Sequence, residues 1–390
     1  MAKRTKAISG STSSETSPPA SEEVTASNVD LLSDILLRVP PKSLLTFKSV
    51  SKYWLHLISD SQFASNHSRR NRNLSISGLY LDYGYYEPVN SVSLHSHQNP
   101  PSLSFLNSIR EGFPIMIQSS CNGLLLCNNR RTVGNPNSYK LRLIVCNPTT
   151  QKYTLLPQPP KCEFLASFLA FDPSKSPHYK VVLYHLYDEF EIYSSETASW
   201  KLVTVGEPLG VRVKRVFWNG AIHWLKEGDR EFHFRFDVDE EKLLKTPISP
   251  EPKIVSIDDI SYYGECGGHL ILIHSPSRFA MQFKILEMER DTFDWVVKCR
   301  VNLRRTSPLL SDDIAFRRDS YIFHVICVVK EEDDFALVMA TAGEIVYYNV
   351  KYKTRKVLRQ MIPQGDFRPL FGRPDGFPNT FQFVESLSPL

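Results

Sequence analysis

A short motif, a turn followed by Thr-x-x-aromatic, recurs along most of this chain at a nearly constant interval. It ends at Tyr153, Trp200 and Trp295, where the second aromatic follows the first by 47 residues and the third follows the second by 95, about two units. Weaker copies place Leu243 and Val357 at the aromatic position. A repeat of this length restricts the chain to architectures in which each unit buries its apolar face against the next one.

A second feature has the same period. Small-residue turns that enter an apolar run occur at Asn122-Gly123, Asn219-Gly220 and Gly267-Gly268, spaced by 97 and 48 residues. The runs between the turns have the length of strands. Because the four-stranded blades of β-propellers repeat at about 40 to 50 residues, we expect an all-β, propeller-like domain over 74–362, with about six blades in the roughly 300 residues available.

The segment before this region has helical spacing. Apolar residues from Leu31 to Val39 fall on one stripe of a helix, which Pro40-Pro41 should end. Pro41 can open a second helix and Ser51 can cap a third, so three short helices are expected in a domain over 28–68. Residues 1–27 contain almost no large apolar side chains, and we expect a disordered tail there.

This helical unit is too small to bury all of its apolar side chains. Units below about 40 residues are marginal without disulfides, metal or a partner, and the segment 28–63 contains no cysteine. Its apolar stripes are wider than one neighbouring helix can cover. We therefore expect a partner protein to cover part of them.

The same residues carry a family resemblance. The segment 28–63, NVDLLSDILLRVPPKSLLTFKSVSKYWLHLISDSQF, resembles the F-box, through which substrate receptors dock onto the Skp adaptor of Skp-cullin-F-box ubiquitin ligases. The usual opening Leu-Pro of the family is replaced by Ser27-Asn28. The resemblance implies docking on a Skp-family adaptor, and through it on cullin, by Leu31, Leu32, Ile35, Leu36, Val39, Pro40, Leu44, Val50, Lys52 and Trp54.

Which of these side chains face inward is open at this point, and Trp54 suits the helical core and the adaptor contact equally well. A Leu36→Asp substitution is expected to abolish adaptor binding while the β domain stays folded.

The β region resembles the plant F-box-associated domain. The likeness lies in SCNGLLLC (120–127), CNPTTQKYTLLPQPP (146–160), LAFDPSKSPHYKVVLY (169–184), FEIYSSETASWKLV (190–203) and FWNGAIHWL (217–225). The expected fold class is thus α+β multidomain, a small three-helix F-box followed by an all-β, propeller-like domain. The Pro- and Gly-rich segment 363–390 shows no strand signal and is expected to be irregular.

Composition and motifs restrict the function. A formal net charge of +4 over 390 residues does not indicate nucleic-acid binding, no apolar run approaches the roughly 18 residues of a membrane span, and the start of the chain does not resemble a signal peptide. The seven cysteines are scattered, and no catalytic motif, metal-ligand spacing or cofactor-binding loop occurs.

We therefore expect an intracellular, soluble, non-catalytic substrate receptor in nucleus or cytoplasm, without cofactor or metal, whose β domain binds a target protein of unknown identity. The alternatives are a propeller enzyme or glycan-binding module whose helical segment does not dock, and a scaffold that uses the F-box outside a ligase.

Overall fold

The structure is a computed structural model of the chain. It describes residues 30–71, 75–84, 88–95, 99–110, 114–133, 135–161, 164–185, 189–205, 213–226, 232–248, 259–275, 281–303, 323–332, 334–341, 343–360 and 378–390. The expected tail at 1–27 lies outside these ranges.

The described part of the chain begins with a compact helical unit. Residues 30–36 form a helix, followed by α2 (Pro41–Phe47), α3 (Lys52–Ser59) and α4 (Ser61–Arg70). Pro41 opens α2, and the Ser51 hydroxyl caps α3 by accepting a hydrogen bond from the Trp54 N–H, as expected. The expectation of three helices misses α4, whose sequence SQFASNHSRR carries few apolar side chains and whose cap is Asp60.

The rest of the described chain forms six antiparallel sheets. Two of the four-stranded sheets consist of β3 (Met116–Cys121), β4 (Leu124–Val133), β5 (Asn135–Asn147) and β6 (Lys152–Leu155), and of β7 (Ala166–Ala170), β8 (Lys180–Tyr184), β9 (Glu189–Ser194) and β10 (Ser199–Thr204). The third and fourth consist of β11 (Val213–Trp218), β12 (Ala221–Lys226), β13 (Phe232–Asp237) and β14 (Lys242–Pro247), and of β15 (Ile260–Cys266), β16 (His269–His274), β17 (Gln282–Met288) and β18 (Trp295–Asn302).

The fifth consists of β19 (His324–Lys330), β20 (Phe335–Ala340), β21 (Glu344–Asn349) and β22 (Thr354–Gln360). The sixth sheet has the order β2-β1-β23, from β1 (Gly78–Asp82), β2 (Asn90–Ser93) and β23 (Asn379–Phe383). A 3-10 helix, Leu103–Ile109, follows β2.

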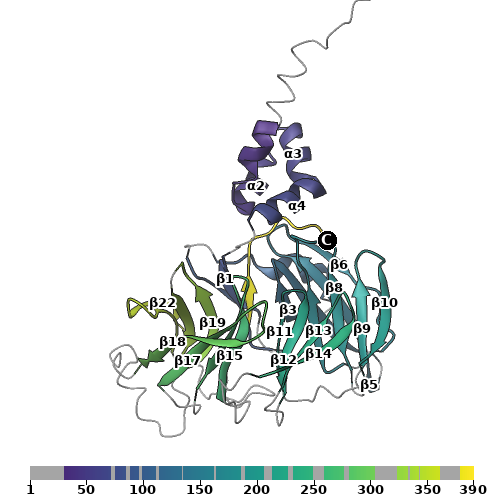
Figure 1. Cartoon of the computed structure of the whole chain (residues 1–390). Helices are drawn as coiled ribbons and strands as arrows, with labels where there is room; N and C mark the ends of the chain where they lie inside the picture. The colour runs from purple at the N-terminus through teal and green to yellow at the C-terminus, as the bar shows by residue number, and fades with distance from the viewer. Residues whose placement is uncertain are drawn as a thin grey trace, which may run out of the picture.

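The six sheets close into a ring. The innermost strands β3, β7, β11, β15, β19 and β23 each contact the innermost strands of both neighbouring sheets, which leaves no gap between the first blade and the last. The expected propeller of about six blades is therefore confirmed, and Figure 1 shows the helical unit standing on one side of it.

Closure joins the two ends of the propeller in one sheet. Strand β23 pairs with β1 from Gly78 opposite Phe383 to Asp82 opposite Asn379. The expectation that 363–390 is irregular is therefore wrong for residues 379–383, while residues 363–377 lie outside the described ranges. The segment NTFQF is short and follows a Pro- and Gly-rich stretch, and its partner strand lies about 300 residues earlier.

Both repeated motifs mark hairpin turns. Asn122 and Gly123 have φ values of 46° and 88°, and Asn219 and Gly220 have 48° and 82°, as a type I′ turn between two strands requires. The Thr-x-x-aromatic motif and its weaker copies place a left-handed residue just before the outermost strand of a blade, at Gln151, Ala198, Glu241, Phe293 and Lys353.

Apolar side chains fill the space between neighbouring blades. The rings of Phe190 on β9 and Phe236 on β13 stack 4.4 Å apart between the second and third four-stranded sheets. Trp295 is buried in the same kind of position, whereas Trp200 is half-buried and donates its indole N–H to the Pro157 carbonyl. Tyr153 is exposed, so the repeated aromatic does not serve as an inter-blade contact in every unit.

We predict that Phe236→Ala lowers the free energy of unfolding by about 3–5 kcal/mol, because it leaves a cavity between two blades. Urea denaturation followed by tryptophan fluorescence measures this loss. Leu244→Ala on the neighbouring strand β14 is the control, since Leu244 is 37% exposed, and it should change stability by no more than about 0.5 kcal/mol. Equal losses in the two variants would contradict the inter-blade assignment.

Candidate functional site

The helical unit has an apolar core of its own. Leu36, Leu44 and Ile58 are 1%, 0% and 2% exposed and pack together with Phe63 and with Leu387 from the end of the chain. Leu36 and Leu44 are two of the residues predicted to contact an adaptor, and both are thus buried inside the unit, with almost no surface open to a second protein. A Leu36→Asp substitution would place a carboxylate in this core and unfold the unit, so it does not test docking.

A second group of apolar side chains, on the helix at 30–36, on α3 and in the turn between α2 and α3, faces solvent. Leu31 is 60% exposed, Ile35 53%, Val50 60%, and Tyr53 and Leu55 are both 45% exposed. Figure 1 shows that the helix at 30–36 and α3 lie farther from the ring than α4 does. We call these five residues the exposed apolar set, and they are the large apolar side chains that the described part of the helical unit leaves to solvent.

The remaining residues predicted to contact an adaptor are either exposed or half-buried. Pro40 and Lys52 are exposed, while Leu32 and Val39 are half-buried against the helical core. Trp54 is half-buried too, and its ring meets that of Phe47 edge-on at 5.6 Å, so much of its surface is used inside the unit. The sequence prediction omitted Tyr53 and Leu55, although both lie in the apolar segment KYWLHLIS of α3.

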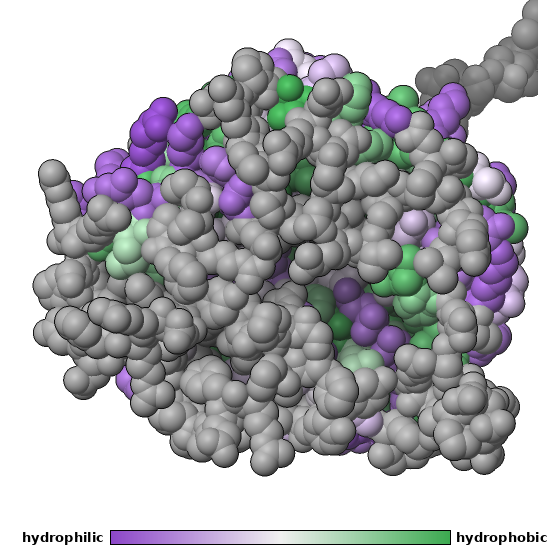
Figure 2. Space-filling view, turned by 90° about the horizontal axis from the view of Figure 1, so that it is seen from below, coloured by the Kyte–Doolittle hydropathy of each residue, from purple (hydrophilic) through white to green (hydrophobic). Residues whose placement is uncertain are grey.

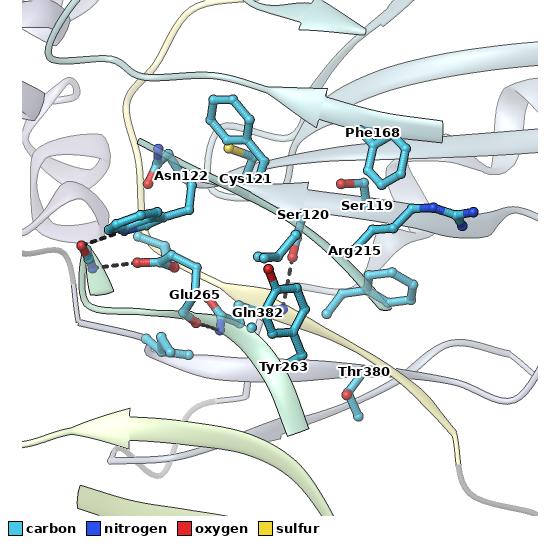
Figure 3. A pocket seen from close by; sticks show the side chains of 18 of the residues that line it. Ser119, Ser120, Cys121, Asn122, Phe168, Arg215, Tyr263, Glu265, Thr380 and Gln382 are labelled. Atoms are coloured by element: carbon cyan, nitrogen blue, oxygen red, sulfur yellow. Dashed lines mark hydrogen bonds between the residues drawn. The ribbon is translucent and has the colours of Figure 1, made fainter. Parts of the chain in front are cut away.

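The second candidate site is the central channel of the ring, a cavity of about 900 Å³. Its lining comes from the innermost strands of all six sheets and from the turns that follow several of them. Side chains that lie around it include Ser119 on β3, Arg215 on β11, Tyr263 on β15 and Thr380 on β23 (Figure 3). Seen from the side opposite the helical unit, the ring is hollowed at its centre (Figure 2).

Hydrogen bonds across the channel hold the closing strand in place. The Gln382 amide donates to the Glu265 carbonyl at 2.8 Å, and its backbone N–H donates to the Ser120 hydroxyl at 3.1 Å (Figure 3). Burial raises the pKa of the Glu265 carboxyl, a shift that the hydrogen bond from the Gly268 N–H opposes. Burial also lowers the pKa of the Arg215 guanidinium. The channel is thus a polar space that contains both a carboxyl group and a cation.

The channel also contains a thiol, that of Cys121. Burial raises the pKa of this thiol, which donates a hydrogen bond to the Phe171 carbonyl. A thiol in this state is a poor nucleophile, since only the thiolate reacts. In the described ranges no three His, Cys, Asp or Glu side chains gather in a way that could hold a metal ion, and no helix there is long and apolar enough to cross a membrane.

Comparisons with known proteins decide the family. Residues 28–66 match the F-box domain, and residues 85–363 match the F-box associated beta propeller domain. The chain belongs to the F-box proteins with an F-box-associated propeller. Among its relatives, the F-box protein At5g07610 of Arabidopsis thaliana is 32% identical over 95% of this chain and 94% of that protein. The F-box protein At5g49610 of the same plant is 28% identical over 70% and 79%.

The matched ranges agree with the architecture, with one difference at the ring closure. The F-box match covers the helix at 30–36, α2, α3 and the first half of α4. The propeller match stops short of both closing strands, since β1 ends at Asp82 and β23 begins at Asn379. The strands that close the propeller of this F-box protein are therefore found from the structure and not from the family match.

Two histidines of the propeller are buried as a stacked pair between blades. His223 Nδ1 lies 3.4 Å from His233 Nε2, which lies 3.2 Å from the Tyr263 hydroxyl, and His223 Nε2 lies 3.1 Å from the Trp218 carbonyl oxygen. Burial lowers the pKa of His223 to about 3 and the pKa of His233 well below its ordinary value, and Arg235 adds to both shifts. His223 lies on β12 and His233 on the paired strand β13.

We predict that this pair makes the propeller less stable in acid. Above about pH 6.5 both rings are neutral in the folded and unfolded states. As the pH falls below that value, the unfolded chain binds protons that the folded chain excludes, so stability is lost down to the folded pKa values. The melting temperature should therefore fall between pH 7.5 and pH 5.

The test variant is His233→Gln, which replaces the titrating ring by a neutral, hydrogen-bonding amide. It should make the decrease smaller than in the unsubstituted protein. An identical pH dependence in both proteins would contradict the assignment.

Proposed function

We propose that this protein is the substrate-recognition subunit of a Skp-cullin-F-box ubiquitin ligase, in which the F-box docks on a Skp-family adaptor and the propeller binds the target. The observation that carries the proposal is the exposed apolar set, Leu31, Ile35, Val50, Tyr53 and Leu55, on a helical unit whose own core is already filled. Large apolar side chains that remain in solvent on a small folded unit indicate a protein interface.

The propeller supplies a second surface. The central channel, whose hollow is visible from the side opposite the F-box, is the site that we assign to the target (Figure 2). In this arrangement adaptor and target bind on opposite sides of the ring and do not compete for space.

The receptor performs no bond chemistry in this proposal. It raises the effective concentration of the target's lysine side chains near the ubiquitin carrier that the adaptor and cullin bring. In this proposal the affinities of the receptor for the adaptor and for the target set the rate of ubiquitin transfer. Both affinities can be measured in binding experiments without the transfer reaction.

We predict that Ile35→Asp weakens adaptor binding by at least about tenfold, because docking would then bury an unpaired carboxylate. Isothermal titration of the purified protein with a plant Skp-family adaptor measures this change. Ile35 is 53% exposed, so the substitution should leave the melting temperature nearly unchanged.

The matched control is Leu202→Asp on β10 of the propeller, where the leucine is 50% exposed. It introduces the same charge at a similar exposure, far from the F-box, and should bind the adaptor normally. Unchanged binding by Ile35→Asp, or equal weakening in both variants, would overturn the docking proposal.

A further inference from the structure

The last seven residues, 384–390, run between the F-box and the ring as a segment without regular secondary structure (Figure 1). They leave the end of β23 and are largely buried, with Ser386 and Ser388 each 2% exposed. The two hydroxyls satisfy each other, since the Ser386 hydroxyl lies 2.7 Å from that of Ser388 and accepts from the Ser388 N–H. The buried backbone groups of the segment also require hydrogen-bond partners, and the propeller supplies these.

The side chain of Asn147 binds the backbone of this segment. Its side-chain amide donates to the carbonyl oxygens of Ser386 and Ser388 at 3.0 and 2.9 Å, and its oxygen accepts from the Thr149 and Thr150 N–H groups. Asn147 is itself fully buried, so its side chain is committed to these bonds. The Thr149 hydroxyl completes the contact by accepting from the Ser386 N–H at 3.1 Å.

A glycine makes room for the same segment. At Gly123, a Cβ atom would stand 2.3 Å from the Ser386 Cβ and 3.0 Å from the Val384 carbonyl oxygen. Gly123 belongs to the SCNG motif, and Asn147 and Thr149 belong to the CNPTT motif. Two motifs that carry the resemblance to the F-box-associated domain thus meet at the end of this chain.

The other side of the segment contacts the F-box. Leu387 is 6% exposed and packs into the helical core with Leu36 and Leu44. The Lys42 ammonium on α2 lies 2.9 Å from a Glu385 carboxylate oxygen and 5.6 Å from the centre of the Phe383 ring. The segment therefore makes both an apolar contact and a charged contact with the helices.

Direct contact between helices and strands is slight by comparison. Among the helices and strands that the structure describes, α3 contacts both α2 and α4, but none of the three makes an extensive contact with a strand.

We propose that residues 384–390 are an interdomain strap, held on the propeller by Asn147, Thr149 and Gly123, which inserts Leu387 into the F-box core and fixes the orientation of the F-box on the ring. The CNPTT and SCNG motifs then form the site on the propeller to which the strap binds. A fixed orientation also sets the distance between whatever binds the exposed apolar set and whatever binds the opposite side of the ring.

The experiment measures orientation and needs no adaptor, so its result is independent of the proposed docking. Spin labels are introduced at the exposed residues Lys52 on α3 and Lys298 on β18 through a genetically encoded amino acid, which leaves the native thiols unlabelled. Pulsed electron resonance on the full chain should give one narrow distance distribution. Leu387→Asp and Asn147→Ala should each broaden it at least twofold.

A charge exchange gives the matched control. Glu385→Lys alone should broaden the distribution, and Lys42→Glu combined with Glu385→Lys should narrow it again, because the ion pair is restored in reverse. Both side chains are partly exposed, so these variants keep their fold, which near-ultraviolet circular dichroism checks. The charge-exchange variants therefore test whether the strap fixes the orientation of the F-box, even where Leu387→Asp or Asn147→Ala unfolds a domain.

Distributions that stay narrow in Glu385→Lys and in every folded strap variant would overturn the proposal. Broadening in Glu385→Lys that the double exchange fails to reverse would also overturn it, since the contact would then not be the cause.

Discussion

The pairing of β1 with β23 is the constraint on which the rest of this structure depends. A sheet of three strands, two from the start of the propeller and one from its end, converts an open array into a closed ring. Without it the innermost strands β3 and β19 would each have an unpartnered side, and the channel would open laterally. Strand β23 leads directly into the segment that contacts the F-box, so one stretch of chain, 379–390, both closes the ring and contacts the helices.

The F-box shows how one apolar stripe divides into two roles. Leu36 and Ile35 are adjacent in the sequence, yet one is 1% and the other 53% exposed. Leu36 turns toward α2 and the strap, while Ile35 faces solvent. A small domain can therefore fold on its own chain and still keep a surface for a partner, because the two tasks use different sides of the same helix.

The repeat in the sequence was sufficient to predict the blades, because each blade is built from local hairpins whose turns need particular residues. Asn122-Gly123 and the left-handed residues before the outer strands could be located by this requirement alone. Three features escaped for physical reasons. Strand β23 has its partner about 300 residues away, α4 carries too few apolar side chains to show a helical period, and periodicity marks an apolar stripe without saying which part of it a neighbour covers. The channel could not be predicted, since its lining gathers from six sheets.

The position of β23 and the strap at the end of the described chain has a consequence for synthesis. During synthesis the F-box leaves the ribosome before the blades, which follow in order. The ring cannot close before β23 pairs with β1, and the helical core is incomplete before Leu387 packs into it, so both steps wait for residues 379–390. Until then, β1 lacks its pairing with β23, and Leu36 lacks its contact with Leu387. A chain that stops before residue 379 would therefore contain nearly every blade but no closed ring, and it would expose the apolar side chains that β23 and Leu387 cover.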